Sequence, residues 1–297
     1  MIDNAQTQSQ SILGAPIRRR GKVTRIWRHL RKAPASAWFG LIVIAIYVIT
    51  SVFAPLLAPY SETELVGGGF EPWSSQFILG TDQLGRDMLS RLIYGARNTV
   101  GIAFLTTMLS FALGSALGLM AAISGGWIDQ VLSRSVDVLM SIPQLIFALV
   151  LLSILGPSIL NLIVIMAVLD STRVFRLSRS VAQGVVVMDY VEAARLRGEK
   201  LPWIMRREIL PNIMPPLVAE FGLRFCFVFL TISALSFLGL GIQPPTADWG
   251  SMVRDNAALI TYGDITPLLP AGAIALLTVS VNFVVDWFLH KTSGLRE

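Results

Sequence analysis

The chain has 297 residues, of which 54% are hydrophobic and only 14% are charged. An ordinary soluble domain carries about 25% charged residues. Together with a mean hydropathy of +0.64, this composition excludes a disordered chain and argues against a soluble globular enzyme. The apolar residues fall in blocks of roughly 17 to 25, the length that a helix needs to cross a bilayer. We therefore expect an integral membrane protein.

Six such blocks predict an all-α, polytopic fold with six transmembrane helices. They are expected at about residues 38–58, 99–123, 136–155, 159–174, 213–240 and 267–289. With the N-terminus inside the cell, the cytoplasmic segments hold 19 of the 24 Lys and Arg residues and the external segments hold four. Because Lys and Arg are enriched in cytoplasmic loops, the sequence predicts that both termini lie inside the cell.

Eight of these basic residues lie before the first apolar block, together with a single acid. They predict a cytoplasmic segment, residues 1–36, that is held by anionic lipid and does not bind nucleic acid. Within it, Ile26, Trp27 and Leu30 can share one side of a helix in the membrane interface, although a simple charged flank fits equally well. The polar residues 1–16 are expected to be disordered.

The chain offers few groups for catalysis or metal binding. The one cysteine, Cys226, lies in an apolar block and has no partner for an internal disulfide. The two histidines, His29 and His290, lie at opposite ends of the chain, which argues against a histidine metal site and against a histidine general base within the membrane. No stretch matches Gly-x-x-x-x-Gly-Lys-Ser/Thr, the loop that binds nucleotide phosphates. We expect no enzyme active site, cofactor or metal in this chain.

The segment 173–212 is longer than a connection between membrane helices requires, and it holds eight basic and four acidic residues. Asp189 and Glu192 have the spacing of a capping box, which begins a helix. Gly198 stands where a left-handed residue often ends one. The alternative is a solvated surface loop with two amphipathic turns.

A second helix is expected after this glycine. Pro202 can occupy the first position of that helix, where its missing N–H costs nothing. Leu210 precedes Pro211 and is therefore disfavoured in the α region, which predicts that the second helix ends there. The sequence thus predicts two short helices, bent at a glycine, on the cytoplasmic face.

Charged residues within the predicted spans need a reason, because a charge near the bilayer centre costs a few kcal/mol. Glu220 and Arg224 are four residues apart and can form an ion pair on one helix face; alternatively, one of them lines a translocation path and meets a charged end of the substrate. Asp170 is expected to pair with Arg173 or Arg176 near the cytoplasmic surface. The ionisable residues in or near the spans, which are the candidates for the translocation path, are Asp170, Glu220, Arg224 and Asp286.

Gly114 and Gly118 are four residues apart in the second predicted span. Small residues at this spacing lie on one helix face and allow a second helix to approach closely. We therefore expect helix packing at this face, not a pore.

Three groups of residues resemble the permeases of ATP-binding-cassette (ABC) importers. Glu192-Ala193-Ala194, followed by Gly198 and by Ile209-Leu210-Pro211, resembles their EAA motif. Two further stretches are similar to the dipeptide/oligopeptide/nickel permease family and to its C-type subunit in particular. They are residues 79–87 with 94–97, which include Gly80, Thr81, Asp82, Gly85, Arg86 and Asp87, and residues 237–245 with 248–250. The chain departs from the family at Glu199, where an alanine is common.

This resemblance implies a type I ABC importer transmembrane domain over residues 37–291, with an external loop at 59–98, a cytoplasmic coupling loop at 173–212 and a tail at 292–297. It implies that the loop docks on a separate ATPase subunit. The residues implied in coupling are Asp189, Glu192, Ala193, Ala194, Arg195, Gly198, Pro202, Ile209, Leu210 and Pro211.

The same resemblance implies the partners and the function. The partners would be a second, homologous permease, two ATP-binding subunits that bind ATP and magnesium, an external substrate-binding protein and the lipid of a bacterial inner membrane. The substrates would be di- or oligopeptides or related small solutes. An ion-coupled secondary transporter is the alternative, but that class does not account for the 189–211 segment. A membrane-embedded enzyme is disfavoured, because the chain lacks a nucleophile with a suitable base.

Overall fold

The computed structural model describes residues 33–292. The chain divides into two units, residues 1–35 and residues 36–297, and the following concerns the second. The predicted interfacial helix, the expected disorder of residues 1–16 and the tail therefore fall wholly or mainly outside the described residues.

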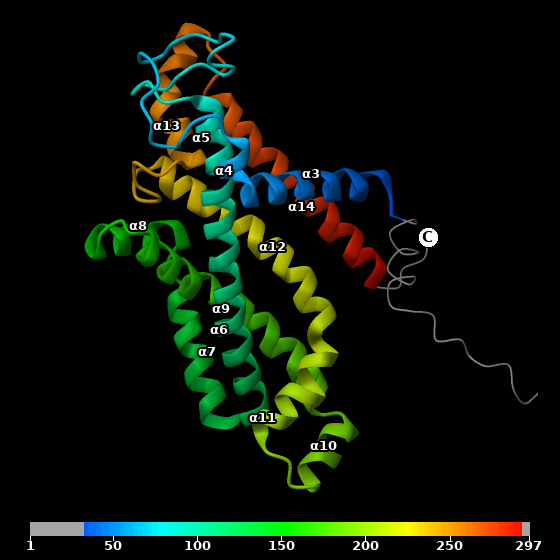
Figure 1. The fold of residues 1–297 in the computed structure, drawn as a ribbon. Coiled ribbons are helices and arrows are strands. Elements are labelled where there is room, and N and C mark those ends of the chain that lie inside the picture. The colour runs from blue at the N-terminus through cyan, green and yellow to red at the C-terminus, as the bar shows by residue number, and fades with distance from the viewer. Residues whose placement is uncertain (1–32, 293–297) are drawn as a thin grey trace, which may run out of the picture. The chain divides into compact units, whose positions relative to one another are not determined.

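The described residues are mostly helical (Figure 1), which confirms the all-α prediction for this part of the chain. One isolated antiparallel bridge joins Thr81 to Asp87. The helices are α3 (Ala35–Val52), α4 (Ala54–Leu57), α5 (Met88–Gly95), α6 (Gly101–Ser124), α7 (Gly126–Met140), α8 (Gln144–Leu155), α9 (Ile159–Val186), α10 (Asp189–Leu196), α11 (Leu201–Ile204), α12 (Leu210–Phe237), α13 (Trp249–Asn256) and α14 (Leu268–Thr292), with the π-helical turns η1 (Ala96–Val100) and η2 (Met205–Ile209) and the 3₁₀ turn η3 (Ala257–Tyr262).

Within the described residues, four helical stretches are long and apolar enough to cross a membrane. They are Ala35–Val52, Met88–Ser124, Leu201–Phe237 and Leu268–His290, and α7 with α8 forms a fifth candidate if a bent pair counts as one span. The predicted block at 159–174 lies in α9, which also carries Asp170 and three arginines and so is less apolar than the others.

The third predicted span, 136–155, contains a sharp bend at residues 141–143, where the sequence Ser-Ile-Pro is typical of a kink. The chain bends by 86° between α7 and α8. Pro143 lies at the break and precedes the first residue of α8. A proline disfavours the α conformation in the residue before it, which here is Ile142, and this explains why the helix is interrupted there.

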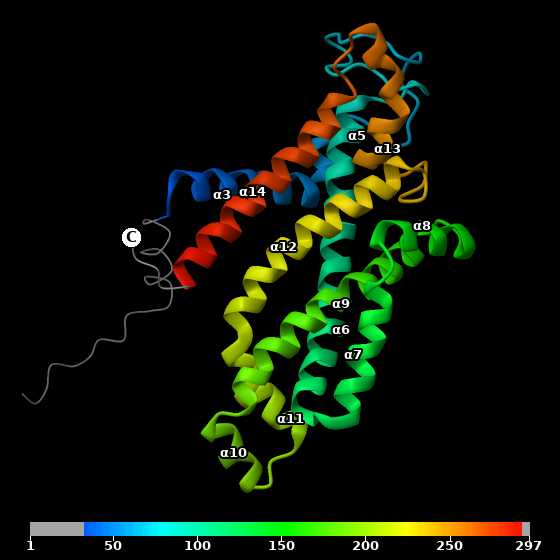
Figure 2. The same cartoon turned by 180° about the vertical axis from the view of Figure 1, so that it is seen from behind.

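The long helices α6 and α9 pack side by side (Figures 1 and 2), with α12 against both. Their close contact confirms the prediction for Gly114 and Gly118: a Cβ atom on Gly114 would lie 2.5 Å from the Ser171 carbonyl oxygen, and one on Gly118 would lie 2.7 Å from that of Phe175. Helices α10 and α11 lie at one end of this bundle, and α13 with the loop before α5 lies at the other.

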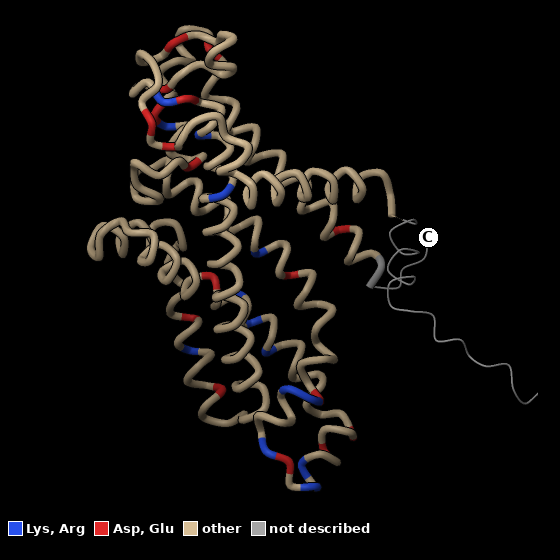
Figure 3. Tube along the Cα trace, viewed as in Figure 1, with Lys and Arg blue, Asp and Glu red and all other residues tan. Residues whose placement is uncertain are grey.

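Charged residues lie at these two ends and along α7, α9 and α12, whereas α3, α6 and α8 carry none (Figure 3). The apolar core is formed by residues of α6, α8, α9, α12, α13 and α14. Trp249 is its largest fully buried side chain, and its indole Nε1 donates a hydrogen bond to the Leu92 carbonyl at 2.9 Å. The core therefore fixes α13 and α5 to the end of the long helices.

Candidate functional site

Helix α10 lies at the tip of the bundle, between α9 and α12 in the sequence. It ends two residues before Gly198, whose φ of +79° is left-handed, as the sequence predicts. Val191 and Ala194 are buried against the base of the bundle. Leu196 has 83% of its surface exposed. One face of α10 thus holds it to the protein, and the opposite face is free.

The predicted capping box is absent. Met188 occupies the N-cap position, and Asp189 is the first helical residue; no side chain caps this end. Both Asp189 and Glu192 still lie in the first turn, where a negative charge is stabilised by the helix dipole without a hydrogen bond. Glu192, Ala193 and Arg195 are exposed, so they lie on the free face.

The predicted end of the second helix at Leu210 is wrong. Leu210 is helical, with φ −53° and ψ −45°, and the chain continues through η2 into α12. The N–H of Leu210 bonds to the carbonyl of Met205, five residues back. This wider turn places Pro211 in the first turn of α12, where a proline costs little. Pro202 is the second residue of α11, one position later than expected.

This continuity joins α10 to the bundle. Ile209 and Ile213 are fully buried and belong to the same apolar cluster as Val191 and Ala194 of α10. A displacement of α10 therefore acts directly on the base of α12, because the contact between them is close-packed.

Four charged residues, Asp170, Arg173, Glu220 and Arg224, meet between α9 and α12; we call them the charge cluster. Arg224 Nε lies 2.7 Å from Glu220 Oε1, which confirms the predicted pair. Arg224 Nη1 lies 3.8 Å from Asp170 Oδ1. The guanidinium carbon of Arg224 is 4.6 Å from the centre of the Phe227 ring, and that of Arg173 is 6.0 Å from it.

The predicted pairing of Asp170 with Arg173 or Arg176 is wrong. Asp170 is only 1% exposed, faces Arg224 and accepts a hydrogen bond from Ser110 Oγ at 2.8 Å. Arg176 instead lies 3.2 Å from Asp137 of α7. The reason is the rotation of α9: Asp170 lies on the side packed against α6 and α12, and Arg176 lies on an exposed side.

Asp286, the fourth ionisable residue predicted in or near a span, does not join the charge cluster. It lies on α14 and is exposed. Asn282, one turn earlier, donates a hydrogen bond to the carbonyl of Thr278 at 2.9 Å. The structure therefore brings together three of the four residues that the sequence singled out.

The predicted external signature is a compact, hydrogen-bonded turn. Asp82 accepts a hydrogen bond from Arg86 Nε at 2.7 Å and lies 3.4 Å from Arg91 Nε, and all three side chains are buried. Asp87 caps α5 by accepting a hydrogen bond from the Ser90 N–H at 2.8 Å. These contacts hold the loop before α5 in place.

Glycines and a threonine shape the rest of this turn. Gly80 and Gly85 have φ of +72° and +79°, a region that favours glycine over other residues. Thr81 Oγ1 donates a hydrogen bond to the Gly68 carbonyl at 2.7 Å. The signature residues thus have structural partners within the loop.

Asp248 forms a second buried polar contact at this end. It caps α13 by accepting a hydrogen bond from the Ser251 N–H at 2.9 Å, and it accepts another from Thr99 Oγ1 at 2.9 Å. Burial raises the pKa of the Asp248 carboxyl, and these hydrogen bonds act in the opposite direction. The contact ties α13 to η1.

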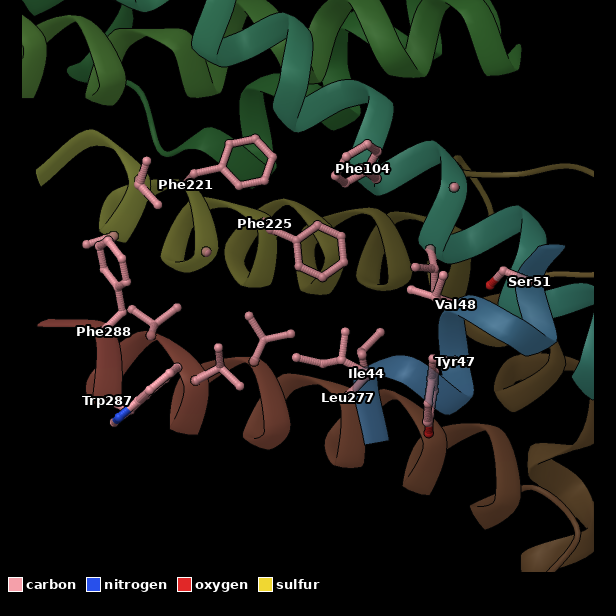
Figure 4. Close-up of a pocket in the computed structure, with 18 of the residues that line it drawn as sticks. Ile44, Tyr47, Val48, Ser51, Phe104, Phe221, Phe225, Leu277, Trp287 and Phe288 are labelled. Atoms are coloured by element: carbon pink, nitrogen blue, oxygen red, sulfur yellow. The ribbon is translucent and has the colours of Figure 1, made fainter. Parts of the chain in front are cut away.

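An apolar groove of about 630 Å³ opens between α3, α6, α12 and α14. Figure 4 shows Phe221 and Phe225 of α12 opposite Trp287 and Phe288 of α14, with Tyr47 of α3 at the other end. The sequence identified none of these residues as a group. Within the described residues, no cluster of three or more His, Cys, Asp or Glu side chains could hold a metal ion.

Two family models match the chain. The family described as "Binding-protein-dependent transport system inner membrane component" matches residues 114–292, and "N-terminal TM domain of oligopeptide transport permease C" matches residues 23–67. The first match covers more than half of the chain and includes the charge cluster and α10. The chain belongs to this permease family.

Curated relatives agree with this assignment. The permease is 34% identical over 264 residues to the "Dipeptide transport system permease protein DppC" of Alkalihalophilus pseudofirmus, a match that covers 87% of this chain and 83% of that protein. It is 35% identical over 265 residues to the "Di/tripeptide transport system permease protein DppC" of Pseudomonas aeruginosa, covering 87% and 85%. This membership favours the binding-protein-dependent permease over the ion-coupled secondary transporter.

Solved structures support the fold. A structure of the MetNI methionine ABC transporter in an inward-facing conformation is similar with a TM-score of 0.52 at 19% identity, covering 68% of this chain and 97% of that one. An amino acid ABC transporter is similar with a TM-score of 0.51 at 21% identity, covering 68% and 94%. The permease thus shares the fold of ABC importer transmembrane domains and is a multi-pass membrane protein.

Some contacts of the site had no signal in the sequence. Ser110 was visible only as a small residue near Gly114, and Phe227 only as part of an apolar block. Glu62 accepts hydrogen bonds from Asn98 Nδ2 at 3.0 Å and from the Ala247 N–H at 2.8 Å. These partners are more than 30 residues away along the chain, so no local pattern indicates them.

Proposed function

We propose that the permease is the membrane subunit of an ATP-driven, binding-protein-dependent importer for short peptides. The names of the two DppC relatives, with the matching C-type family model at residues 23–67, support the substrate class. The chain would form half of the translocation path beside a second, homologous permease, in a bacterial inner membrane. An external binding protein would deliver the substrate. ATP and magnesium would be bound by two separate ATPase subunits, and this chain would need no cofactor of its own.

We infer that α10, the turn at Gly198 and the start of α12, residues 189–211, form the segment that couples to the ATPase. The observation that carries this inference is the pairing of an exposed and a buried face on α10. Leu196 and Glu192 are exposed for docking, and Val191 packs against Ile209 at the base of α12. A movement imposed on α10 would therefore turn α12, which runs through the membrane.

The proposed topology has six spans and both termini inside the cell. It counts α9 as a span despite its charges, since Asp170 accepts a hydrogen bond from Ser110 and faces the positive charge of Arg224. It takes α7 and α8 together as one bent span. The excess of Lys and Arg around α10 supports placing that end in the cytoplasm, and α13 then lies outside. The proposed domain comprises residues 37–291, with a basic segment before it and a short tail after it.

We further infer that the second permease covers the exposed apolar surface of α3 and the groove beside it. Ile42, Ile46 and Ile49 of α3 are each about half exposed (54%), and the groove is almost wholly apolar in its lining. Moving apolar side chains from lipid into a protein contact yields little free energy, so the affinity of this contact would depend on how closely the two surfaces fit.

Single cysteines test the coupling segment and the topology together. In a Cys226→Ser background, Leu196→Cys is placed on α10 and Tyr262→Cys, 85% exposed, at the opposite end as a matched control. With a thiol-reactive photo-crosslinker, Leu196→Cys is expected to cross-link to the ATPase subunit in the purified complex, and Tyr262→Cys is not. In intact cells only Tyr262→Cys should react with a membrane-impermeant maleimide. Labelling of Leu196→Cys from outside would refute the proposal.

A further inference from the structure

The charge cluster is balanced in total but not in its contacts. Asp170, Glu220 and Arg224 lie within ion-pairing distance of one another through the guanidinium group and together carry one excess negative charge. Arg173 forms no ion pair within 4.0 Å in the part of the chain that the structure describes, and its guanidinium faces the Phe227 ring that Arg224 also faces. The formal charges of the four side chains therefore cancel, but the positive charge of Arg173 lies apart from the negatively charged group of the other three.

The cluster lies deep in the bundle. Asp170 is eleven residues after the start of α9 at Ile159, or about 17 Å along the helix. Arg224 is thirteen residues before the end of α12 at Phe237, or about 20 Å. In a hydrocarbon layer of about 30 Å, both positions lie within the membrane.

Part of the cluster is nevertheless exposed on the outside of the subunit. Arg173 is exposed, Glu220 is half-buried, and Phe227, whose ring Arg173 faces, is 49% exposed. Charged side chains at this depth face a water-filled cavity, a ligand or another protein, because exposure to lipid tails costs several kcal/mol. This face is therefore a wall of a polar path or an interface, not a lipid-facing surface.

A recess lies beside Arg173, at the bend between α7 and α8. Its volume is about 120 Å³, which exceeds the roughly 30 Å³ that a water molecule occupies in the liquid. Gln144, Thr172 and Arg173 provide its polar lining, and Pro143 provides part of its apolar lining. The recess can therefore hold a group of the size of a carboxylate against a cation.

Three atoms in the buried part of the cluster have no hydrogen-bond partner within the described residues: Asp170 Oδ1, Arg224 Nε and Arg224 Nη1. Arg224 Nε lies in the ion pair with Glu220. Asp170 Oδ1 and Arg224 Nη1 face each other at 3.8 Å, which is too long for a hydrogen bond. Ser110 holds the other Asp170 oxygen, and Arg224 holds Glu220. The buried side chains thus position Glu220 at the exposed face and leave an excess of negative charge behind it.

We propose that this wall binds both ends of a short zwitterionic peptide in the translocation path. The peptide's C-terminal carboxylate binds Arg173 in the recess, and its N-terminal ammonium binds Glu220. Asp170 and Arg224 are positioning residues, since they act through Glu220. A ligand with one charge of each sign leaves the net charge of the cluster unchanged, whereas a purely anionic or cationic ligand would change it. This inference rests on the proposed peptide import.

The spacing favours short peptides. Glu220 Oε1 is 2.7 Å from Arg224 Nε, and the guanidinium carbons of Arg224 and Arg173 lie 4.6 Å and 6.0 Å from the centre of the same Phe227 ring, so the Glu220 and Arg173 charges lie on either side of one aromatic residue. A fully extended chain spans up to about 3.5 Å per residue, so a tripeptide spans about 10 Å. Peptides with blocked ends would lose one of the two contacts.

Uptake by the complete transporter in proteoliposomes, with its ATPase subunits and binding protein, tests the proposal. The probes are labelled trialanine, trialanine amide and N-acetyltrialanine, each at a concentration that saturates the binding protein. Arg173→Gln is expected to lower trialanine uptake about tenfold and to leave uptake of the amide unchanged. Glu220→Gln is expected to lower trialanine uptake similarly and to leave uptake of the N-acetyl peptide unchanged.

The controls separate recognition from structure. Because one binding protein delivers every peptide, its own preference cancels when a variant is compared with wild type. Arg134→Gln, at an arginine of α7 whose side chain is 86% exposed, is expected to change nothing. Arg173→Lys keeps the charge but not the planar guanidinium, and it should restore part of the uptake that Arg173→Gln loses. If the binding protein binds only trialanine and neither blocked peptide, the comparison of Arg173→Lys with Arg173→Gln decides between recognition and packing.

Three results would overturn the inference. The first is an equal loss of uptake for all three peptides in both variants, which a packing role predicts. The others are variants whose preference among the three peptides is that of wild type, and failure of Arg173→Lys to restore the uptake that Arg173→Gln has lost. A wild-type transporter that takes up none of the peptides would instead contradict the proposed function.

Discussion

The contact between α6 and α9 gives the sharpest test of the fold. A methyl group on Gly114 would lie 2.5 Å from the Ser171 carbonyl oxygen, and one on Gly118 would lie 2.7 Å from the Phe175 carbonyl oxygen. Both obstacles are backbone atoms, so the methyl group can be accommodated only if one helix moves. Gly184, in an exposed part of α9, has no atom within 4 Å of such a methyl group and is the matched control.

The expected magnitudes follow from two opposing terms. Overpacking costs about 1–3 kcal/mol, and replacing a helical glycine with alanine gains up to about 1 kcal/mol. Gly114→Ala should therefore lose up to about 2 kcal/mol of unfolding free energy, whereas Gly184→Ala should gain up to about 1 kcal/mol. The difference of up to about 3 kcal/mol corresponds to roughly 6–12 °C in the unfolding midpoint of a domain of this size.

The measurement is the thermal unfolding midpoint of the detergent-purified protein, followed by the fluorescence of its seven tryptophans. Gly114→Ala is expected below wild type and Gly184→Ala at or above it. Gly118→Ala should behave as Gly114→Ala does, because its neighbour is also backbone. If Gly114→Ala melts at or above Gly184→Ala, α6 and α9 do not approach as described, and the placement of Asp170 opposite Ser110 falls with it.

Two further predictions concern the ends of the bundle. Gly198→Asp should place a side chain at a φ of +79°, at a cost of about 1–2 kcal/mol, and Glu192→Lys should alter the free face of α10. Both variants should remain inserted in the membrane but lose substrate-stimulated ATP hydrolysis. Normal ATP-dependent uptake by either variant would contradict this. Asp248→Asn removes a carboxyl whose pKa is raised above 3.8 by burial. Because the native carboxyl holds its proton more tightly than the unfolded one, it contributes stability below the ordinary pKa, and that contribution is lost as pH rises through the raised value. Chemical denaturation should therefore show that wild type loses stability relative to Asp248→Asn as pH increases from about 4. Parallel pH profiles of the two proteins would refute this.

The sequence predicted features that depend on local chemistry. Gly198 ends α10 in the left-handed region because few other residues do so readily, and the Gly114–Gly118 spacing marks the face packed on α9 because small residues four apart permit contact. The i, i+4 spacing of Glu220 and Arg224 was likewise sufficient to predict their pairing. Each of these predictions needed only the helix geometry and the residue type.

The failures have a common cause in tertiary context. Leu210 was expected to leave the helix because it precedes Pro211, but a π-turn places the proline where the helix tolerates it. Asp170 was paired with its neighbours on α9 because the rotation of α9 against α12 could not be known from the sequence. The partners of Asp170 are 54 and 60 residues away along the chain, and a local sequence pattern cannot predict contacts between residues so far apart.

The position of the charge cluster links the two ends of the protein. Helix α10 is joined to α9 before it and, through η2, to α12 after it, so both helices respond to any movement of α10. Helix α9 is held to α6 at Gly114 and Gly118, and it meets α12 at the 3.8 Å contact between Asp170 and Arg224. A relative rotation of α9 and α12 would change this contact, because it has no hydrogen bond to hold it. A movement of α10 would thus reach Glu220 in two ways, along α12 itself and through the contact of Arg224 with Glu220.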